Sequence, residues 1–103
     1  MTEQQIQNEI ILAINQRGHR LFRANAGKVI TKDNRVIKLL PKGFPDTFGY
    51  RKSDGKFIAI EVKTESGRLR SEQKKFKAFA ETQNILYGVA TNVEEAIQII
   101  ESE

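Results

Sequence analysis

The sequence contains no cysteine, only two prolines and a single histidine, His19. Without cysteine, the chain can form neither a disulfide framework nor a thiolate metal site. Its apolar runs are far shorter than the roughly 20 residues that a membrane-spanning helix requires, and residues 2–9, TEQQIQNE, lack the pattern of a signal peptide. We therefore expect a soluble cytoplasmic protein without membrane contacts. Because His19 follows the helix-stopping Gly18, we expect it at the surface.

Positive charge is in only mild excess, with 17 Lys and Arg against 13 Asp and Glu and a net charge of +4. This balance is compatible with a polyanionic partner but does not require one. With 39% hydrophobic and 29% charged residues, the chain has the composition of a folded globular protein. Its 103 residues suit one domain that covers 1–103.

Hydrophobic periodicity predicts helices that alternate with strands. The first helix follows a capping box of Thr2 and Gln5, and a basic hairpin over 28–40 is expected to turn at Asp33–Asn34. Helices are expected over 3–17, over 71–82 with Ser71 as its N-cap, and after Asn92; strands are expected over 20–26, 46–50, 56–63 and 85–90. This order predicts an α/β fold in which a mixed central sheet is flanked by helices.

The segment FIAIEVK, residues 57–63, ends an apolar strand with two charged side chains. Alternate residues of a strand share a face, so Glu61 and Lys63 leave the sheet side by side. A tight turn over 51–55 pairs this strand antiparallel with the strand that begins at Asp46. The start of one strand then lies beside the end of the other, so we expect Asp46 near Glu61 and Lys63.

Two carboxylates and an amine at one strand end suit the hydrolysis of a phosphodiester. Mg²⁺ prefers oxygen ligands, so we expect Asp46 and Glu61 to hold the ion, with the backbone carbonyl of Val62 as a further ligand. The ion would polarise a phosphoryl oxygen and acidify a bound water. The ammonium of Lys63 would hold that water or the developing negative charge.

The chain contains a second Glu-x-Lys, Glu72 to Lys74, so the tripeptide by itself does not indicate an active site. It follows a predicted helix cap, and residues two apart on a helix do not face each other. Other interpretations of the first copy remain open. Glu61 and Lys63 can form an exposed ion pair of small value, and Asp46 can stabilise a turn after Pro45.

Nine residues match the motif of a known nuclease family in type, order and spacing. They are Gly43, Pro45, Asp46, Glu61, Lys63, Gly67, Arg68, Leu69 and Gln73. In this pattern the chain resembles the VRR-NUC domain, a branch of the PD-(D/E)XK nuclease superfamily. The resemblance runs from the first helix to about Gly88. It implies a restriction-endonuclease-like fold with the core order α-β-β-β-α-β, an inserted hairpin and a C-terminal helix.

The resemblance also implies a nuclease that depends on Mg²⁺ or Mn²⁺. Asp46 and Glu61 would be metal ligands, Lys63 would assist the water, and Gln73 and Glu9 would line the site. Single-domain members from viruses and phages are associated with branched DNA, including four-way junctions. The resemblance therefore implies a structure-selective DNA endonuclease that acts as a homodimer in DNA repair, in a bacterial or phage-infected cell.

Two of these site residues have simpler interpretations from the sequence. Glu9 lies beside the apolar stripe of the first helix and can be an ordinary exposed charge. Gln73 falls on the inward face of its helix with Phe76 and Ala80, where a polar group needs a partner. That partner can be the adjacent strand end or the start of its own helix.

Basic residues gather in the first half of the chain and again after the Glu-x-Lys strand. Charge runs are usually solvated faces, but contacts with phosphates dominate the nonspecific affinity for DNA. We expect DNA contacts from Arg23, Asn25, Lys28, Arg68, Arg70, Lys74 and Lys75. No base-reading motif is evident, so recognition should depend on DNA shape.

Three functions stay open on the sequence alone: a structure-selective endonuclease, a general nicking enzyme or exonuclease, and a non-catalytic nucleic-acid-binding module. The intact set of Asp46, Glu61 and Lys63 favours the enzymes. A pure binding module has no use for clustered acids beside phosphates, since like charges repel unless a cation intervenes.

Overall fold

A computed structural model describes residues 1–24 and 26–102. In chain order the described elements are α1 (Glu3–Gln16), β1 (Arg20–Arg23), β2 (Lys28–Ile30), β3 (Val36–Lys38), β4 (Thr47–Tyr50), β5 (Phe57–Val62), α2 (Ser71–Ala80), β6 (Leu86–Ala90) and α3 (Val93–Glu101). Four strands form one sheet in the order β1-β4-β5-β6. β4 pairs antiparallel with β1 and β5, whereas β6 joins β5 in parallel after the α2 crossover. This mixed sheet with flanking helices confirms the predicted α/β, restriction-endonuclease-like class.

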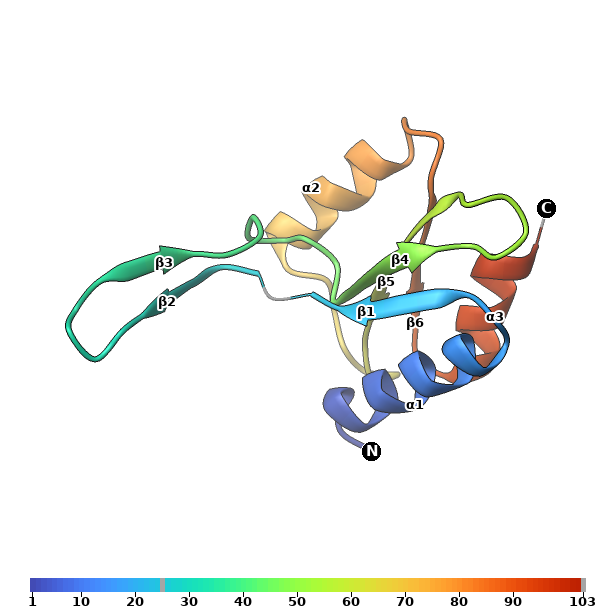
Figure 1. The fold of residues 1–103 in the computed structure, drawn as a ribbon, viewed down its shortest axis with the longest axis horizontal. Helices are drawn as coiled ribbons and strands as arrows, with labels where there is room; N and C mark the ends of the chain where they lie inside the picture. The colour runs from blue at the N-terminus through green and yellow to red at the C-terminus, as the bar shows by residue number, and fades with distance from the viewer. Residues whose placement is uncertain (25, 103) are drawn as a thin grey trace.

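The two faces of the sheet carry different kinds of side chain. Ile58, Ile60 and Val62 of β5 are fully buried against α1 and α3, which contribute an aliphatic core that includes Ile10 and Ile100. On the other face, aromatic rings from the sheet contact those of α2 and of the chain before β4. Figure 1 shows α2 on one side of the sheet and α1 with α3 on the other. Since residues alternate along a strand, Glu61 lies on the α2 face.

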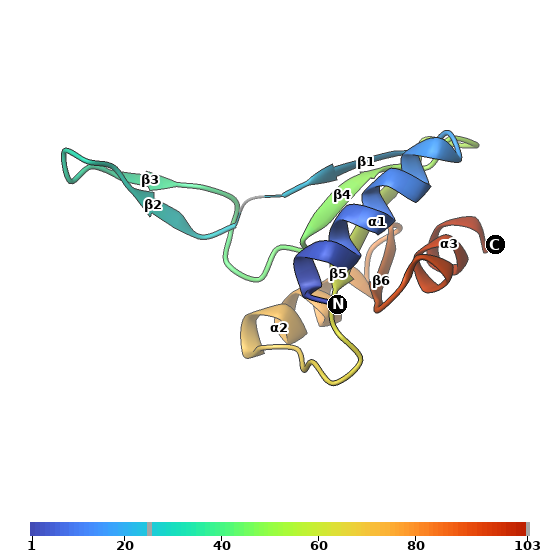
Figure 2. The ribbon, with the colours of Figure 1, turned by 90° about the horizontal axis from the view of Figure 1, so that it is seen from below.

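A hairpin between β1 and β4 extends from this body as an arm, defined here as residues 26–40. β2 and β3 pair antiparallel, and the turn between them contains Asn34 with a φ of 63°. Both views show the arm projecting away from the sheet and the helices (Figures 1 and 2). The predicted hairpin and its turn at Asp33–Asn34 are confirmed.

Several predicted boundaries differ from the observed ones. The strand expected over 20–26 ends at Arg23, because the chain leaves the sheet after the Ala24 N–H donates to the Asp46 carbonyl (2.8 Å). Arg70, not Ser71, is the N-cap of α2. Its extended backbone is stabilised by the side chain of Gln73, whose Oε1 accepts from the Arg70 N–H. α2 also ends at Ala80, earlier than the expected Thr82.

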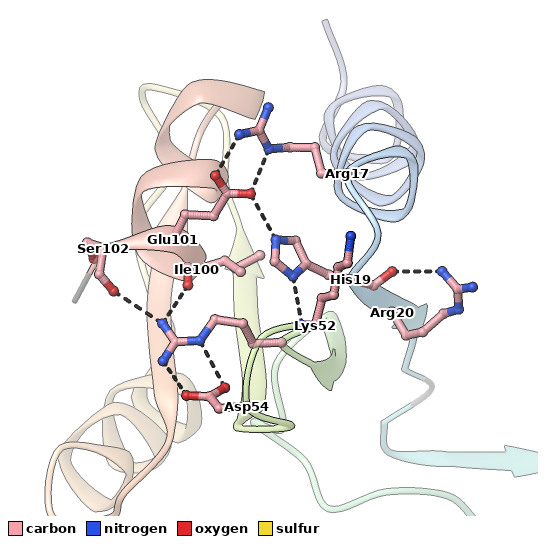
Figure 3. A network of polar contacts seen from close by, with 9 residues as sticks. Arg17, His19, Arg20, Lys52, Asp54, Ile100, Glu101 and Ser102 are labelled. Carbon is pink, nitrogen blue, oxygen red and sulfur yellow. Dashed lines mark hydrogen bonds and ion pairs between the residues drawn. The ribbon is translucent and has the colours of Figure 1, made fainter.

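His19 is buried, which corrects the expectation of a surface histidine: only 5% of it is exposed. The Lys52 N–H donates to its Nδ1 (3.0 Å), so the ring proton is on Nε2, which lies 2.9 Å from Glu101 Oε2. Arg17 also donates to Glu101 and lowers the pKa of that carboxyl to about 2. Figure 3 shows how this network ties the end of α1 to the β4–β5 turn and the end of α3.

Within the described part of the chain, none of the helices combines the length and the apolar character that crossing a bilayer requires.

Candidate active site

The β4–β5 hairpin brings Asp46 beside Glu61. Its register pairs Thr47 with Ile60, so the preceding Asp46 lies opposite Glu61. The Thr47 hydroxyl donates to the Ile60 carbonyl (2.9 Å), and the Val62 N–H donates to Asp46 Oδ2 (2.8 Å). The carboxylate of Asp46 thus accepts the hydrogen bond that a backbone carbonyl would accept if β4 were longer, and this bond holds it against the end of β5. The adjacency expected from the turn and the strand alternation is present.

Glu61 is an acid in an environment that disfavours its charge. Its side chain is almost fully buried, with 1% of the residue exposed, and Gln73 Nε2 donates to its Oε2 (2.9 Å). Its Oε1 is buried and accepts no hydrogen bond from any described residue. Burial, followed by hydrogen bonding with and repulsion by Asp46, raises the pKa of Glu61 to about 9. Without a cation, the side chain of Glu61 is therefore protonated at neutral pH.

Gln73 connects the start of α2 to this carboxylate. Its side chain is buried, its Oε1 accepts from the Arg70 N–H (2.8 Å) and its Nε2 donates to Glu61. Both partners weighed from the sequence, the local helix start and the neighbouring strand end, are therefore engaged at once. Because both ends of the amide are held, Gln73 fixes the orientation of Glu61.

Lys63 continues the alternation of β5 and lies on the same face as Glu61. Its N–H donates to the Ala90 carbonyl (3.1 Å), and only 6% of the residue is exposed. Lysine is almost never buried to this extent without a partner. Its Nζ lies 3.8 Å from Glu3 Oε2, and its charge opposes the rise in the pKa of Glu61. The ammonium is thus enclosed by acids.

Glu3 is a residue of this site that the sequence analysis did not select. Glu9, the α1 acid that the resemblance placed at the site, is exposed and has no contact with Glu61 or Lys63 among the described interactions. A signal for Glu3 was present in the sequence. Glu3 shares the helix face of Ile6 and Ile10, which is the face that packs on the sheet, whereas Glu9 does not.

Gly43 allows the chain before β4 to approach α2. Its φ is +93°, and a Cβ built on it would lie 2.6 Å from the Glu72 carbonyl oxygen. Any larger residue would both strain this backbone and push the loop away from α2. Gly43 therefore keeps Asp46 and Gln73 on the same side of the molecule.

An open groove of about 720 Å³ leads away from these residues. Asp46 and Gln73 line it together with Arg70 and the arm residues Lys28 and Lys38. Among the described residues, no three His, Asp or Glu side chains gather as a ready metal cluster. A divalent ion here would therefore depend on two carboxylates, backbone oxygen and water, which is a set that suits Mg²⁺.

The basic residues that were expected to contact DNA lie on β1, on the arm and around the start of α2. Arg68, Arg70, Lys74 and Lys75 are exposed on the loop before α2 and on α2 itself, and Lys28 is exposed on the arm. Arg23 is exposed as well, but its guanidinium donates to Asn8 of α1. Asn25 lies outside the described residues.

The family of the chain is shown by comparison with known domains. The model of the VRR-NUC domain matches residues 1–94, which include Asp46, Glu61, Lys63, Gln73 and the arm. No curated protein matches the chain. The chain therefore belongs to the VRR-NUC domain family, a nuclease family, and its function is of the nuclease type.

Proposed function

We propose that this protein is a divalent-metal-dependent endonuclease that hydrolyses phosphodiester bonds in DNA, with a preference for branched molecules such as four-way junctions. The observation that carries the proposal is the buried carboxylate of Glu61 beside the partly exposed Asp46, in which Glu61 Oε1 has no described hydrogen-bond donor. Two neighbouring acids are costly to keep together in an apolar setting unless a cation joins them.

The residues present fit Mg²⁺ or Mn²⁺. Asp46 and Glu61 offer hard carboxylate oxygens, and the free Oε1 faces no competing donor among the described residues. The N–H and C=O of one strand residue point to the same edge. Since the Val62 N–H meets Asp46, the Val62 carbonyl also points to that side. When bound, the ion supplies charge that polarises a phosphoryl oxygen and acidifies a water.

Three side chains of the chain support the reaction around that position. Lys63 provides a buried positive charge that holds the attacking water or the negative charge that develops on the phosphate. Glu3 Oε2 lies 3.8 Å from its Nζ and forms an ion pair with it. Gln73 keeps Glu61 in one orientation through its two hydrogen bonds.

Two copies of the chain would account for action on branched DNA. A twofold axis places two equivalent sites in opposite directions, which suits cuts on opposing strands of a junction. We therefore include a homodimer in the proposal. Light scattering of the protein with and without a four-way junction measures it directly.

The test is a cleavage panel with end-labelled four-way junctions, flaps and plain duplex, each with Mn²⁺, with Mg²⁺ and with chelator. We expect metal-dependent cutting that is fastest on the junction. Asp46→Asn should abolish it, because Asn retains an oxygen for the Val62 N–H but loses the negative charge. Asp54→Asn is the matched control, since it removes the same charge at the opposite end of the β4–β5 hairpin.

The outcomes separate the alternatives. Equal cutting of duplex and junction would indicate a general nicking enzyme or exonuclease. DNA binding that persists in chelator, without any cleavage by folded protein in either metal, would indicate a non-catalytic binding module and would overturn the proposal.

A further inference from the structure

The arm exposes apolar side chains that its own hairpin cannot cover. Val29, Ile30, Val36 and Ile37 are 46%, 64%, 55% and 49% exposed. A two-stranded hairpin by itself is marginally stable in water, and an exposed apolar patch indicates a contact surface. The arm is therefore expected to gain order from a partner.

The charge of the arm indicates which partner. Lys28 lies directly opposite Lys38 in the β2–β3 register, and like charges in this position are destabilising. Among the described residues, no acid forms an ion pair with either lysine. The single acid of the arm, Asp33, pairs with Arg35 near the turn. An anionic partner would relieve the repulsion between the two lysines.

The position of the lysines joins them to the candidate active site. Lys28 and Lys38 line the same groove as Asp46 and Gln73. A nucleic-acid strand with one phosphodiester at the carboxylates would continue past the two amines as it leaves. Duplex DNA carries a phosphate about every 1.7 Å of its axis when both strands are counted. A duplex bound at the carboxylates therefore offers further phosphates to the lysines of the arm.

One face of the arm combines the lysines with an apolar pair. Residues two apart on a strand share a face, so Ile30 follows Lys28 and Val36 precedes Lys38 on that face. The opposite face carries Val29 and Ile37. Because Lys28 and Lys38 line the groove, the apolar pair lies further out along the arm, on the side of its turn.

We propose that this face of the arm is the element that selects branched DNA. Lys28 and Lys38 bind phosphates of the strand that leaves the active site, and Ile30 and Val36 lie against bases that are unstacked at a branch point. Apolar side chains that insert between bases must overcome stacking in an intact duplex, but much less where the stack is already broken. The inference rests on the proposed function for its substrate and adds the origin of its selectivity.

Binding measured in chelator tests the arm separately from catalysis. The probes are a fluorescent four-way junction and a plain duplex of equal length, titrated by anisotropy at several salt concentrations. Ile30→Ser with Val36→Ser should lower the ratio of junction to duplex affinity about tenfold. Val29→Ser with Ile37→Ser, the matched pair on the opposite face, should leave that ratio unchanged.

Lys28→Gln with Lys38→Gln should weaken binding to both probes. We expect about tenfold at physiological salt and a loss of about two from the slope of log affinity against log salt concentration. Lys52→Gln with Lys56→Gln, in the β4–β5 turn, is the control with the same change of charge. Circular dichroism checks that each variant keeps the secondary structure of the wild type.

Several results would overturn the inference. They are a wild type without junction preference, a preference that survives Ile30→Ser with Val36→Ser, and serine pairs that convert a dimer to a monomer. The last would make the arm a contact between subunits. If the variants change DNA affinity as expected but no metal supports cleavage, the inference about the arm stands and the nuclease mechanism fails. If the protein cleaves DNA but Ile30→Ser with Val36→Ser keeps the wild-type preference for the junction, the nuclease mechanism stands and the inference about the arm fails.

Discussion

Glu61→Gln should make the metal-free protein more stable while it removes activity. In the wild type, burial and the neighbouring Asp46 raise the pKa of Glu61 to about 9, from an ordinary value of 4.5. Glutamine has nearly the same shape, carries no charge, and can donate to Asp46 while it still accepts from Gln73. The substitution therefore removes the repulsion without leaving a cavity.

The pKa difference sets the size and the sign of the effect. Between pH 4.5 and about 9, the folded protein binds a proton that the unfolded chain has lost, so the stability of the wild type falls as pH rises. At pH 8 the loss is at most about 5 kcal/mol, from about 1.4 kcal/mol per pH unit. Local relaxation recovers part of it, so we expect Glu61→Gln to gain about 2–4 kcal/mol at pH 8 and nearly nothing at pH 4.

Urea unfolding followed by far-UV circular dichroism, from pH 4 to 9 in chelator, measures this difference. Glu65→Gln is the matched control, because Glu65 is exposed in the loop after β5 and loses the same charge. Adding Mn²⁺ at tenfold its dissociation constant should restore about 1.4 kcal/mol to the wild type and nothing to Glu61→Gln. If the stability difference between the wild type and Glu61→Gln does not grow with pH, Glu61 does not keep its proton in the folded protein and its raised pKa is refuted.

Three further substitutions test separately the amine in the reaction, the residue that orients Glu61, and a network that only stabilises the fold. Lys63→Met should reduce cleavage by at least about a hundredfold, while unfolding experiments still detect Mn²⁺ binding to Glu61; a variant that cuts normally would remove the amine from the mechanism. Gln73→Ala should cost about 1–3 kcal/mol, since it leaves buried groups unpaired, and should weaken Mn²⁺ binding in the same titration. Glu101→Gln should lower the melting temperature because it removes the charge that pairs with Arg17, yet leave the Mn²⁺-induced shift intact; a changed shift would mean that the two ends of the sheet are coupled.

The adjacency at the site could be predicted because it depends on local rules. A short turn fixes the register of β4 and β5, and strand alternation then places Glu61 and Lys63 on one face. Asp46 follows from the same register without any knowledge of the rest of the fold. The position of Gln73 followed from helix periodicity in the same way, although its double role as helix partner and carboxylate partner did not.

The parts that the sequence did not reveal depend on how distant elements meet. Glu3 reaches Lys63 because α1 packs across the sheet with its first turn at the end of β5. His19 is buried because the last turn of α3, 82 residues later, supplies Glu101. Neither contact has a local signature beyond the choice of helix face, so neither could be placed before the helices were docked.

The two ends of the β4–β5 hairpin show why the acid at one end is structural and the pair of acids at the other is suited to a cation. At the turn, two hydrogen bonds from Arg51 lower the pKa of Asp54 to about 2, so that this acid is charged and paired. At the opposite end, two acids face each other beside one lysine, and the pKa of Glu61 rises to about 9. A protein that needed only a stable hairpin would gain from an arginine at both ends. Retaining an unpaired buried oxygen at Glu61 makes sense when a doubly charged ion completes the group.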